Sequence, residues 1–455
     1  MLTPLQVAAR AAYVLRGNDV ASPAGSMTKA APALYPHQWS WDAAFVAIGL
    51  ARVDVARACT ELDTLFRGQW RTGMLPHIVF SETACDYFPD AARWGCAEVT
   101  EDAPGTPRTS GICQPPVHAL AAERILAVAD ERGGDDAVHA RAWLARAYPR
   151  LLAWHRYLAS SRDPDGTGLL AVHHGWESGM DNSPRWDAAY EGVVVGADLP
   201  PYERRDLQHI DDPRQRPSTQ EYERYLWIVE ELKRAGYDDG QVRRSGSFLV
   251  TDVFMSAIFA AASDALARLA QRLDAGEVAE LRAYGQRFRD GVVTAVDPEL
   301  GLALDTDLRT GERVRVRTLA GFAPLVSGGL APDAQQRMVA LLESPQWTGC
   351  PELRWPVVPS TSPASSGFQP RTYWRGPTWP VMNWLFWWSL LQRGEQAAAA
   401  RLRDAALSQL AEGSLAEYYE PFTGEWLGSV DQSWTAAVAL DWLCDPFPSA
   451  SARSS

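Results

Sequence analysis

Apolar residues recur at helical spacing over most of the chain. Apolar positions three and four residues apart share one face of a helix. Such stretches cover residues 3–17, 43–50, 54–66, 117–129, 136–160, 219–235, 250–273, 277–296, 333–342, 379–391, 395–410 and 432–443. The pattern predicts about twelve helices. Strand signals are few, and the turn residues within 297–316 predict one small hairpin.

Residues with known capping preferences mark several helix ends. Thr3 and Pro4 offer a capping hydroxyl and a first-turn proline, and Gly17 is a good stop. Asp42 stands where it could cap the second helix, and the same carboxylate could serve a pocket at that helix end. Gly68 ends the third helix.

The succession of helices predicts the fold class. Twelve helices in consecutive pairs suit an (α/α)6 barrel, whose inner helices can be largely apolar, as residues 250–266 and 379–391 are. Loops rich in polar and aromatic residues separate the helices. We therefore predict an all-α fold, an (α/α)6 barrel with long active-site loops at one end. One domain would span residues 1–445, and the Ser-rich tail over 446–455 would be flexible.

The chain is acidic, and its charge narrows the range of partners. It holds 43 Lys and Arg residues against 56 Asp and Glu residues, for a net charge of −13 among 455 residues. Nucleic-acid binding depends on Lys and Arg side chains that neutralise phosphates. We expect no nucleic-acid partner and no anionic membrane partner. The sequence leaves a homo-oligomer open.

The ends, apolar runs and cysteines predict the compartment. Residues Met1–Gly17 lack the apolar core and cleavage site of a secretory signal. No stretch approaches the length of a transmembrane helix, and the nearest is Phe254–Ala261. The six cysteines form no C-x-x-C pair, which favours free thiols in a reducing compartment. We expect a cytoplasmic protein.

The histidines give no metal-binding pattern. None of the eight forms an H-E-x-x-H or an H-x-H spacing. The adjacent His173 and His174 would point in different directions in either regular structure. We assign no metal and no cofactor.

Residues 175–187 form the most unusual segment of the chain. They include three carboxylates, two tryptophans, an arginine and a Ser-Pro step. The chain has 19 tryptophans, clustered beside polar residues, and flat aromatic faces suit the C–H faces of sugars. The segment predicts an active-site loop. The alternatives are a polar surface loop with two packed tryptophans and, for the tryptophans in general, an aromatic-rich core.

Two separated carboxylate clusters fit the chemistry of glycoside hydrolysis. In an inverting enzyme one carboxyl group protonates the leaving oxygen while another deprotonates water, and the two stand roughly 6.5–9.5 Å apart. Apolar walls would raise the pKa of the acid by desolvation. Residues 176–187 and 417–426 would supply such a pair, although spacing alone does not assign the roles.

Three motifs carry a resemblance to a known family. Residues Trp176–Asp187 (WESGMDNSPRWD) closely resemble the signature of glycoside hydrolase family 63. Residues Tyr373–Pro380 (YWRGPTWP) and the EYYEP run that begins at Glu417, followed by T-G-E at 423–425, resemble it too. The compact length, with Tyr35–Asp42 and Gly73–Phe80, is similar to the bacterial glucosylglycerate and mannosylglycerate hydrolases of that family. The resemblance spans residues 35–434.

The resemblance implies an inverting, metal-independent α-glycosidase on an (α/α)6 barrel, with Asp181 as general acid and Glu417 as general base. By motif position, the residues that would hold the hexose are Tyr35, Trp39, Trp41, Asp42, Gln114, Tyr373, Trp374, Trp379 and Gln432. Those that would hold a glycerate carboxylate are Tyr87, Arg216 and Tyr222, with Arg214 an equally placed alternative to Arg216. An arginine is a suitable partner for a carboxylate.

Other carboxylates compete for both catalytic roles. Glu177 and Asp187 compete with Asp181 as the acid, and we rank Asp181 first and Glu177 second. If residues 177–181 were helical, Glu177 and Asp181 would share a face and perturb each other's pKa. The residues that compete with Glu417 as the base are Glu420 and Glu425.

The resemblance also leaves several functions to compare. The loops at 68–107 and 195–218 resemble the mobile lids of this family. The Ala- and Arg-rich composition indicates a GC-rich bacterial genome and favours 2-O-α-D-glucosylglycerate as the substrate. An osmolyte or reserve-recycling role would fit the resemblance. Mannosylglycerate is the alternative, and a neutral saccharide would gain little from Arg216.

Two further functions come from other classes. A non-catalytic sugar-binding protein would show tight binding without turnover, and the presence of two candidate carboxylates argues against it. A terpenoid cyclase usually needs an Asp-rich motif, and the chain has no D-D-x-x-D or D-x-D-D.

Overall fold

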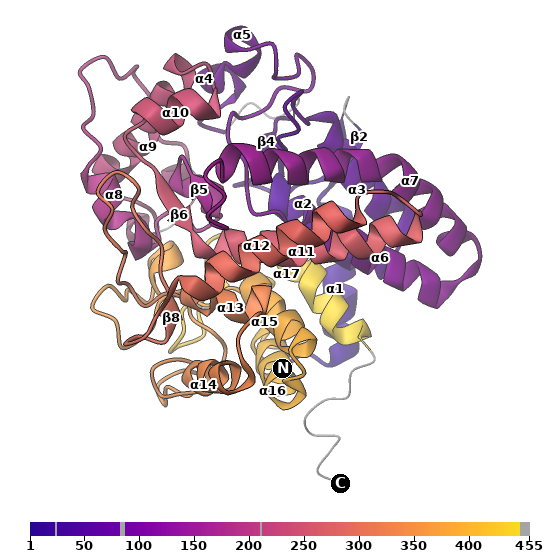
Figure 1. Cartoon of the computed structure of the whole chain (residues 1–455). Coiled ribbons are helices and arrows are strands. Elements are labelled where there is room, and N and C mark those ends of the chain that lie inside the picture. The colour runs from indigo at the N-terminus through magenta and orange to yellow at the C-terminus, as the bar shows by residue number, and fades with distance from the viewer. Residues whose placement is uncertain (23–24, 82–86, 210–211, 446–455) are drawn as a thin grey trace.

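The structure, a computed structural model, describes residues 1–455 except 23–24, 82–86, 210–211 and 446–455 (Figure 1). Its α-helices are α1 (Pro4–Gly17), α2 (Ser40–Ala51), α3 (Val55–Arg67), α4 (Ala91–Trp94), α5 (Cys96–Val99), α6 (His118–Arg132), α7 (Gly134–Tyr157), α8 (Asp187–Glu191), α9 (Thr219–Arg234), α10 (Asp239–Ser245), α11 (Val253–Arg272), α12 (Val278–Thr294), α13 (Ala323–Ser327), α14 (Pro332–Leu342), α15 (Pro380–Gln392), α16 (Gln396–Leu410) and α17 (Ser433–Cys444).

The strands are short and pair two by two in antiparallel fashion. The pairs are β1 (Asp19–Ser22) with β2 (Gly25–Thr28), β3 (Gln38–Trp39) with β4 (Ile78–Val79), β5 (Leu170–Val172) with β6 (Val250–Asp252), β7 (Val296–Asp297) with β8 (Leu302–Ala303), and β9 (Tyr418–Tyr419) with β10 (Trp426–Leu427). The protein is therefore predominantly helical, with small two-stranded sheets.

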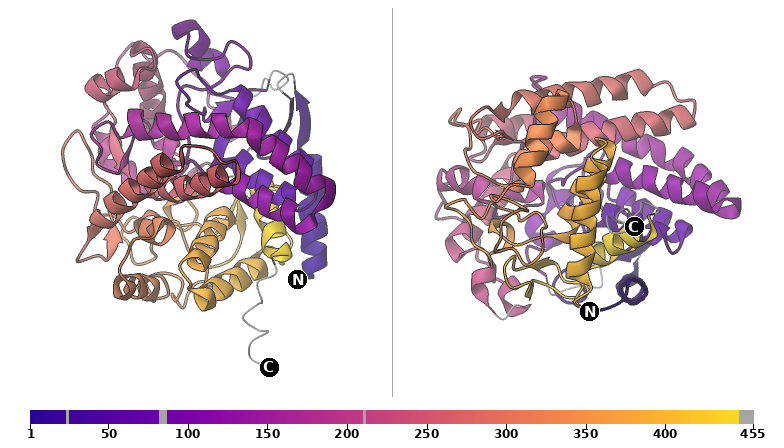
Figure 2. Two further views of the ribbon diagram at one scale, coloured as in Figure 1. Left: turned by 45° about the vertical axis from the view of Figure 1, so that its right-hand side comes forward. Right: turned by 90° about the horizontal axis from the view of Figure 1, so that it is seen from below.

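Six helices follow one another in a closed ring of neighbours. Helix α2 packs against α6, α6 against α11, α11 against α13, α13 against α15, α15 against α17, and α17 against α2 again. Other helices lie outside this ring: α3 and α7 on α2 and α6, α12 on α11, α16 on α15, and α1 on α17. Figures 1 and 2 show that long connecting segments gather at one side of this assembly.

The burial of each helix follows from its sequence. Helices that are apolar on all sides are buried on all sides. All twelve residues of α2 are buried, as are ten of the thirteen residues of α15. By contrast, α12 buries only one stripe that includes Leu281 and Phe288. Gly49 lets α2 and α17 approach closely, because a Cβ there would lie 2.3 Å from Cα of Ala437.

The long predicted helices are confirmed, with shifts of a few residues at their ends. Thr3 caps α1 in a capping box with Gln6. Asp42, a possible cap from the sequence, does not cap the helix: α2 begins at Ser40 after Trp39, so Asp42 lies inside the first turn. The residues before α11 form β6 instead of helix, because they pair with β5. The predicted hairpin is confirmed as β7 and β8.

Helix α11 contradicts the expectation that no apolar stretch approaches the length of a transmembrane helix. Among the described residues it is the one helix with the length and composition of a membrane span, whereas the sequence pattern placed no stretch near that length. However, 89% of its most apolar window is buried inside the protein. Neighbours in the ring therefore cover its apolar surface.

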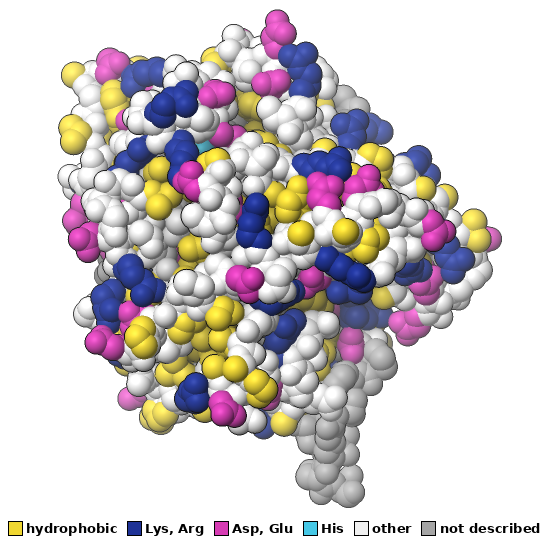
Figure 3. All heavy atoms as spheres, in the orientation of Figure 1, with side chains coloured by type: hydrophobic (Ala, Val, Ile, Leu, Met, Phe, Trp, Pro, Cys, Tyr) yellow, Lys and Arg dark blue, Asp and Glu magenta, His cyan; other side chains and the backbone are white. Residues whose placement is uncertain are grey.

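Charged side chains are mixed on the visible surface. On the face drawn in Figure 3, Lys and Arg side chains lie beside Asp and Glu side chains. The five described cysteines are free thiols: Cys59, Cys96, Cys113 and Cys350 are buried, and Cys444 is exposed. Cys85 lies outside the described residues.

Candidate active site

A cavity opens where several ring helices begin. Trp41 and Asp42, in the first turn of α2, line it, as do Gln432 and Trp434 on either side of the start of α17. Gln114, four residues before α6, adds a further side. Helix N-termini carry partial positive charge, so this end of the ring favours carboxylates and anionic ligands.

Most of the predicted site residues lie around this cavity. Those that line it are Tyr35, Trp39, Trp41, Asp42, Tyr87, Gln114, Asp181, Arg216, Tyr222, Tyr373, Glu417 and Gln432. Trp374 and Trp379 do not line it. They stack on each other behind the wall, with ring centroids 3.7 Å apart and planes 2° from parallel. Their position supports Tyr373 and Trp41, whose rings pack on them.

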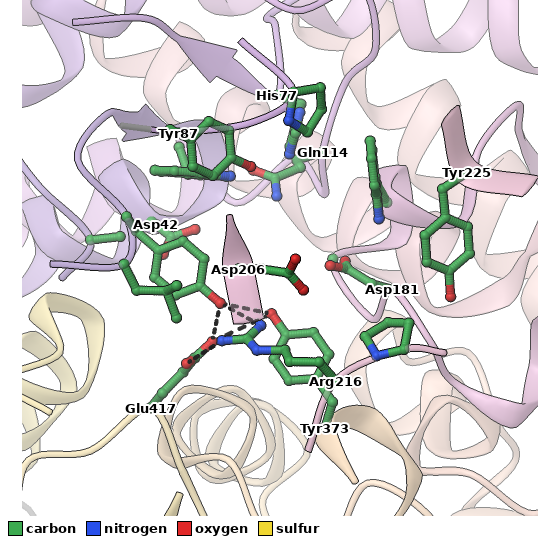
Figure 4. Close-up of a pocket in the computed structure, with 18 of the residues that line it drawn as sticks. Asp42, His77, Tyr87, Gln114, Asp181, Asp206, Arg216, Tyr225, Tyr373 and Glu417 are labelled. Atoms are coloured by element: carbon green, nitrogen blue, oxygen red, sulfur yellow. Dashed lines mark hydrogen bonds and ion pairs between the residues drawn. The ribbon is translucent and has the colours of Figure 1, made fainter. Parts of the chain in front are cut away.

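Glu417 is held by donors on both of its oxygens. Tyr35 donates its hydroxyl to Oε1 at 2.9 Å, and Tyr373 does so at 3.4 Å. The backbone N–H of Ser429 donates to Oε2 at 3.1 Å. Figure 4 shows the Arg216 guanidinium between the Glu417 carboxylate and Tyr373. These contacts fix the carboxylate in one orientation at the cavity wall.

Arg216 is buried beside Glu417 with part of its guanidinium unused. Its Nη1 donates to the Tyr35 hydroxyl at 2.9 Å, and its Nη2 lies 3.7 Å from Oε2 of Glu417. The guanidinium also lies over the ring of Tyr373, 4.6 Å from its centroid. Within the described part of the chain, Nε and Nη2 have no hydrogen-bond partner. Buried donors of this kind are costly unless a ligand or water meets them.

Asp181 faces the same cavity and has the protonation behaviour of an acid. Burial, against the opposing charge of Arg216 and with a smaller contribution from the Glu417 charge, raises its pKa to about 7. Asp42 is another carboxyl group that lines the cavity. Its pKa lies well above the usual range because of burial and the nearby charge of Glu417. Carboxyl groups that share a dry site cannot all ionise.

The competing carboxylates are tied into the scaffold and do not line this cavity. Glu177 forms two 2.7 Å hydrogen bonds with Arg162, and this partner holds its pKa at about 2 against the effect of burial. Asp187 pairs with Arg375, again through two 2.7 Å hydrogen bonds. Neither carboxylate is placed to contact a ligand in the cavity.

The alternatives to Glu417 are likewise engaged elsewhere. Glu420 accepts hydrogen bonds from the backbone of Phe422 and the hydroxyl of Thr423 within its own turn. Glu425 forms an exposed ion pair with Arg371. Neither lines the cavity.

Glu177 and Asp181 diverge because the segment between them is not an α-helix. Residues Gly175–Ser178 form one 3-10 turn, and Gly179 ends it with a left-handed φ of +70°. A Cβ at Gly179 would lie 2.4 Å from the ring of Trp41. The sharp turn directs Glu177 into the core and Asp181 into the cavity.

The residues expected near a glycerate lie on the side formed by the loops. Tyr87 packs edge-on against Trp39, with ring centroids 5.3 Å apart. Tyr222 donates its hydroxyl to the carbonyl of Phe88 at 3.3 Å. The side chain of Arg214 lies outside the described part of the structure.

Further lining residues were not singled out from the sequence. They are Ala30, Leu34, His77, Phe88, Pro89, Trp176, Gly179, Arg205, Asp206, Pro217, Tyr225 and Trp434. His77, Trp176 and Trp434 lie inside or beside the motifs, so a stricter reading of those motifs would have found them. Asp206 carries no such signal, and it reaches the cavity from a loop while paired with Arg204.

The comparison with known proteins decides the family. Residues 35–435 match the model of the mannosylglycerate hydrolase MGH1-like glycoside hydrolase domain. The chain belongs to this glycoside hydrolase family. It is 53% identical over 443 residues to a glucosylglycerate hydrolase of Mycolicibacterium hassiacum, covering 97% of this chain and 98% of the relative. It is also 40% identical over 380 residues to a mannosylglycerate hydrolase of Thermus thermophilus, covering 83% and 87%.

A solved relative has the same architecture as this glycoside hydrolase. The crystal structure of a family 63 (GH63) mannosylglycerate hydrolase from Thermus thermophilus, in complex with Tris and D-glycerate, matches with a TM-score of 0.86 at 39% identity. The match covers 96% of this chain and 99% of the other. The resemblance to family 63 that the motifs carry is thereby confirmed.

Proposed function

We propose that this glycoside hydrolase cleaves 2-O-α-D-glucosylglycerate into glucose and glycerate, with inversion at the anomeric carbon. The observation that carries the substrate is the 53% identity, over nearly the whole chain, to a protein named glucosylglycerate hydrolase. The cavity supports a small anionic glycoside, because it is lined by the candidate acid Asp181, the candidate base Glu417 and a buried arginine, Arg216, whose Nε and Nη2 have no hydrogen-bond partner among the described residues.

The proposed reaction is a single displacement by water. Asp181 gives its proton to the glycosidic oxygen as the bond from that oxygen to the anomeric carbon breaks. Water forms the new bond to the anomeric carbon from the opposite face, and Glu417 takes the water's proton. In Figure 4 the Asp181 and Glu417 side chains enter the labelled cluster from different sides, as this division of roles requires.

The proposed anchor for the glycerate carboxylate is Arg216. Nη1 is engaged with Tyr35, so among the described residues Nε and Nη2 remain for a ligand. A planar guanidinium can bind a carboxylate through two parallel hydrogen bonds. Tyr87 and Tyr222 would complete this end of the pocket, and the remaining predicted residues that line the cavity would hold the hexose.

Mannosylglycerate is the second candidate, because relatives at about 40% identity bear that name. The two substrates differ in one hydroxyl, at C2 of the hexose. The test is the ratio of kcat/KM for the two compounds, with the Asp181→Asn variant as the inactive control. A ratio above about 10 in favour of glucosylglycerate is expected. A ratio below one would move the assignment to mannosylglycerate, and tight binding of both without turnover would leave a sugar-binding protein.

The fold and setting proposed from the sequence fit this activity. We propose that the six-helix ring and its outer helices form an (α/α)6 barrel in one domain, residues 1–445. Loops 68–107 and 195–218 would act as lids, which is supported by Tyr87 and Arg216 lining the cavity from them. Parts of both loops lie outside the described residues. A cytoplasmic location, without nucleic-acid or membrane partners, remains a prediction from the sequence.

A further inference from the structure

Glu177 is the most heavily engaged carboxylate near the cavity, although it does not reach the cavity itself. Its side chain is fully buried. Oε1 accepts hydrogen bonds from Arg162 Nη2 at 2.7 Å and from the backbone N–H of Cys113 at 3.1 Å. Oε2 accepts from Arg162 Nη1 at 2.7 Å and from the backbone N–H of His173 at 2.6 Å. An ionised carboxylate offers about four acceptor positions, so this group is saturated.

The two backbone donors, Cys113 and His173, belong to segments that line the cavity a few residues further along the chain. Cys113 precedes Gln114, which lines the cavity and accepts a hydrogen bond from the backbone of Trp41 at 3.3 Å. His173 precedes the turn that carries Trp176 to the cavity wall. Asp181 follows four residues after Glu177. One buried carboxylate therefore ties together the backbones that present Gln114, Trp176 and Asp181.

Arg162 is itself held from several directions. It ends a single π-helical turn, Leu158–Arg162, that follows α7, and such turns occur frequently at functional sites. Its Nε donates to the hydroxyl of Tyr157 at 3.1 Å and lies 3.0 Å from Oδ1 of Asp239, at the start of α10. The side chain is 2% exposed. A guanidinium held this firmly can fix a partner carboxylate in position.

Glu177 is ionised, but its charge is not among those that shift the pKa of Asp181. Arg162 and the hydrogen bonds keep Glu177 ionised and neutralise its charge. The carboxyl groups that influence the pKa of Asp181 include Glu417 but not Glu177. The ion pair thus positions the loop that carries Asp181, and the charge of Glu177 is not added to that of Glu417 beside Asp181.

We propose that Glu177 and Arg162 are positioning residues for the reaction, and that their ion pair sets where Asp181 meets the glycosidic oxygen. This inference rests on the proposed function and assigns a role beyond it. The pair would act through the backbone of residues 173–181, without touching the substrate. A misplacement of about 1 Å can reduce turnover about 10²-fold.

The test separates positioning of the acid from loss of the fold. The variants are Glu177→Gln and Arg162→Lys, assayed on glucosylglycerate and on α-glucosyl fluoride. Fluoride leaves with little need for protonation, so its hydrolysis depends less on Asp181. The matched control is Asp441→Asn. Asp441 is a fully buried carboxylate bonded to Arg52, Arg124 and Trp384 near the far end of α17, about 12 Å along the helix from the cavity.

For Glu177→Gln we expect kcat on glucosylglycerate to fall about 10²-fold, with KM changed less than about threefold. The loss on α-glucosyl fluoride should be at least tenfold smaller. Arg162→Lys should show the same selectivity with a smaller loss, and Asp441→Asn should lower the melting temperature without changing the ratio of the two activities. If Glu177→Gln does not fold, Arg162→Lys is the variant that tests the inference.

Equal losses on both substrates, or an unchanged kcat in a folded variant, would overturn the inference. The parent enzyme tests the proposed function separately: if it prefers mannosylglycerate, the same ratio is measured with that compound and α-mannosyl fluoride. Failure of the substrate assignment is therefore seen in the parent, and failure of the positioning role is seen only in the variants.

Discussion

Tyr35 donates its phenolic proton to Oε1 of Glu417 over 2.9 Å. The same oxygen of Tyr35 accepts a hydrogen bond from Nη1 of Arg216 at 2.9 Å. One hydroxyl therefore links the proposed base to the proposed carboxylate anchor. Both functions of the pocket therefore depend on this side chain.

Removal of that hydroxyl should weaken both functions. In Tyr35→Phe, Glu417 loses a donor and Arg216 loses the acceptor of Nη1, while the ring stays in place. We expect kcat/KM on glucosylglycerate to fall about 10- to 100-fold, in line with about 1.5–3 kcal/mol for a hydrogen bond to a charged group. The measurement is steady-state kinetics. Tyr13→Phe is the control, because Tyr13 is 70% exposed on α1. A change below twofold in Tyr35→Phe would contradict the link.

Replacement of Arg216 should affect charged substrates selectively. In Arg216→Ala, KM for glucosylglycerate should rise about 10- to 100-fold, because a buried carboxylate would lose its partner. KM for the neutral analogue glucosylglycerol should change much less. Arg214→Ala and Arg205→Ala, assayed beside it, show which arginine binds the carboxylate. If Arg214→Ala gives the selective loss and Arg216→Ala does not, the anchor has been assigned to the wrong residue.

The pKa of Asp181 gives a pH dependence with a definite sign. The acid must be protonated to act, and burial raises its pKa to about 7. The alkaline limb of the pH profile should therefore lie near pH 7, and kcat/KM should fall about tenfold per pH unit above it. Arg216 lowers this pKa, so Arg216→Ala should move the alkaline limb to higher pH. The measurement is kcat/KM from pH 5 to 9. An alkaline limb near pH 4–5 would mean that Asp181 is not the acid.

Gly179 should tolerate no side chain. Its φ of +70° costs an L-residue roughly 1–2 kcal/mol, and a Cβ would also lie 2.4 Å from the Trp41 ring. We expect Gly179→Ala to be less stable than the parent by more than that backbone cost, and to lose activity as Trp41 moves. Gly236→Ala is the control, since its φ is +66° with no atom within 4 Å of the added Cβ. Equal melting temperatures for the two variants, measured by thermal denaturation, would remove the steric argument.

The sequence predicted long helices well and short ones poorly. Stretches of ten or more residues repeat their apolar spacing often enough to be recognised, as α3 and α9 show. The helices α4, α5, α10 and α13 have only four to seven residues, and tertiary contacts stabilise them. The start of α2 was misplaced because the pairing of β3 with β4 sets it, not a capping side chain.

The motifs predicted which segments form the candidate site, but they did not predict which motif residues line the cavity and which support it from behind. Motif residues far apart in sequence, such as Tyr35 and Glu417, do meet in the cavity. Sequence spacing could not separate Glu177 from Asp181, because the difference depends on the tertiary partner Arg162 and on the left-handed turn at Gly179. In the same way, a tryptophan in a motif can support the wall from behind, as Trp379 does.

The central claim is inverting hydrolysis by Asp181 and Glu417. The most direct measurement is a proton NMR time course of glucosylglycerate with the purified enzyme, beside Asp181→Ala and Glu417→Ala. The two anomers of glucose give separate signals before they equilibrate. The account predicts that β-glucose appears first and that both variants lose this release. Initial release of α-glucose, or full activity in either variant, would contradict it.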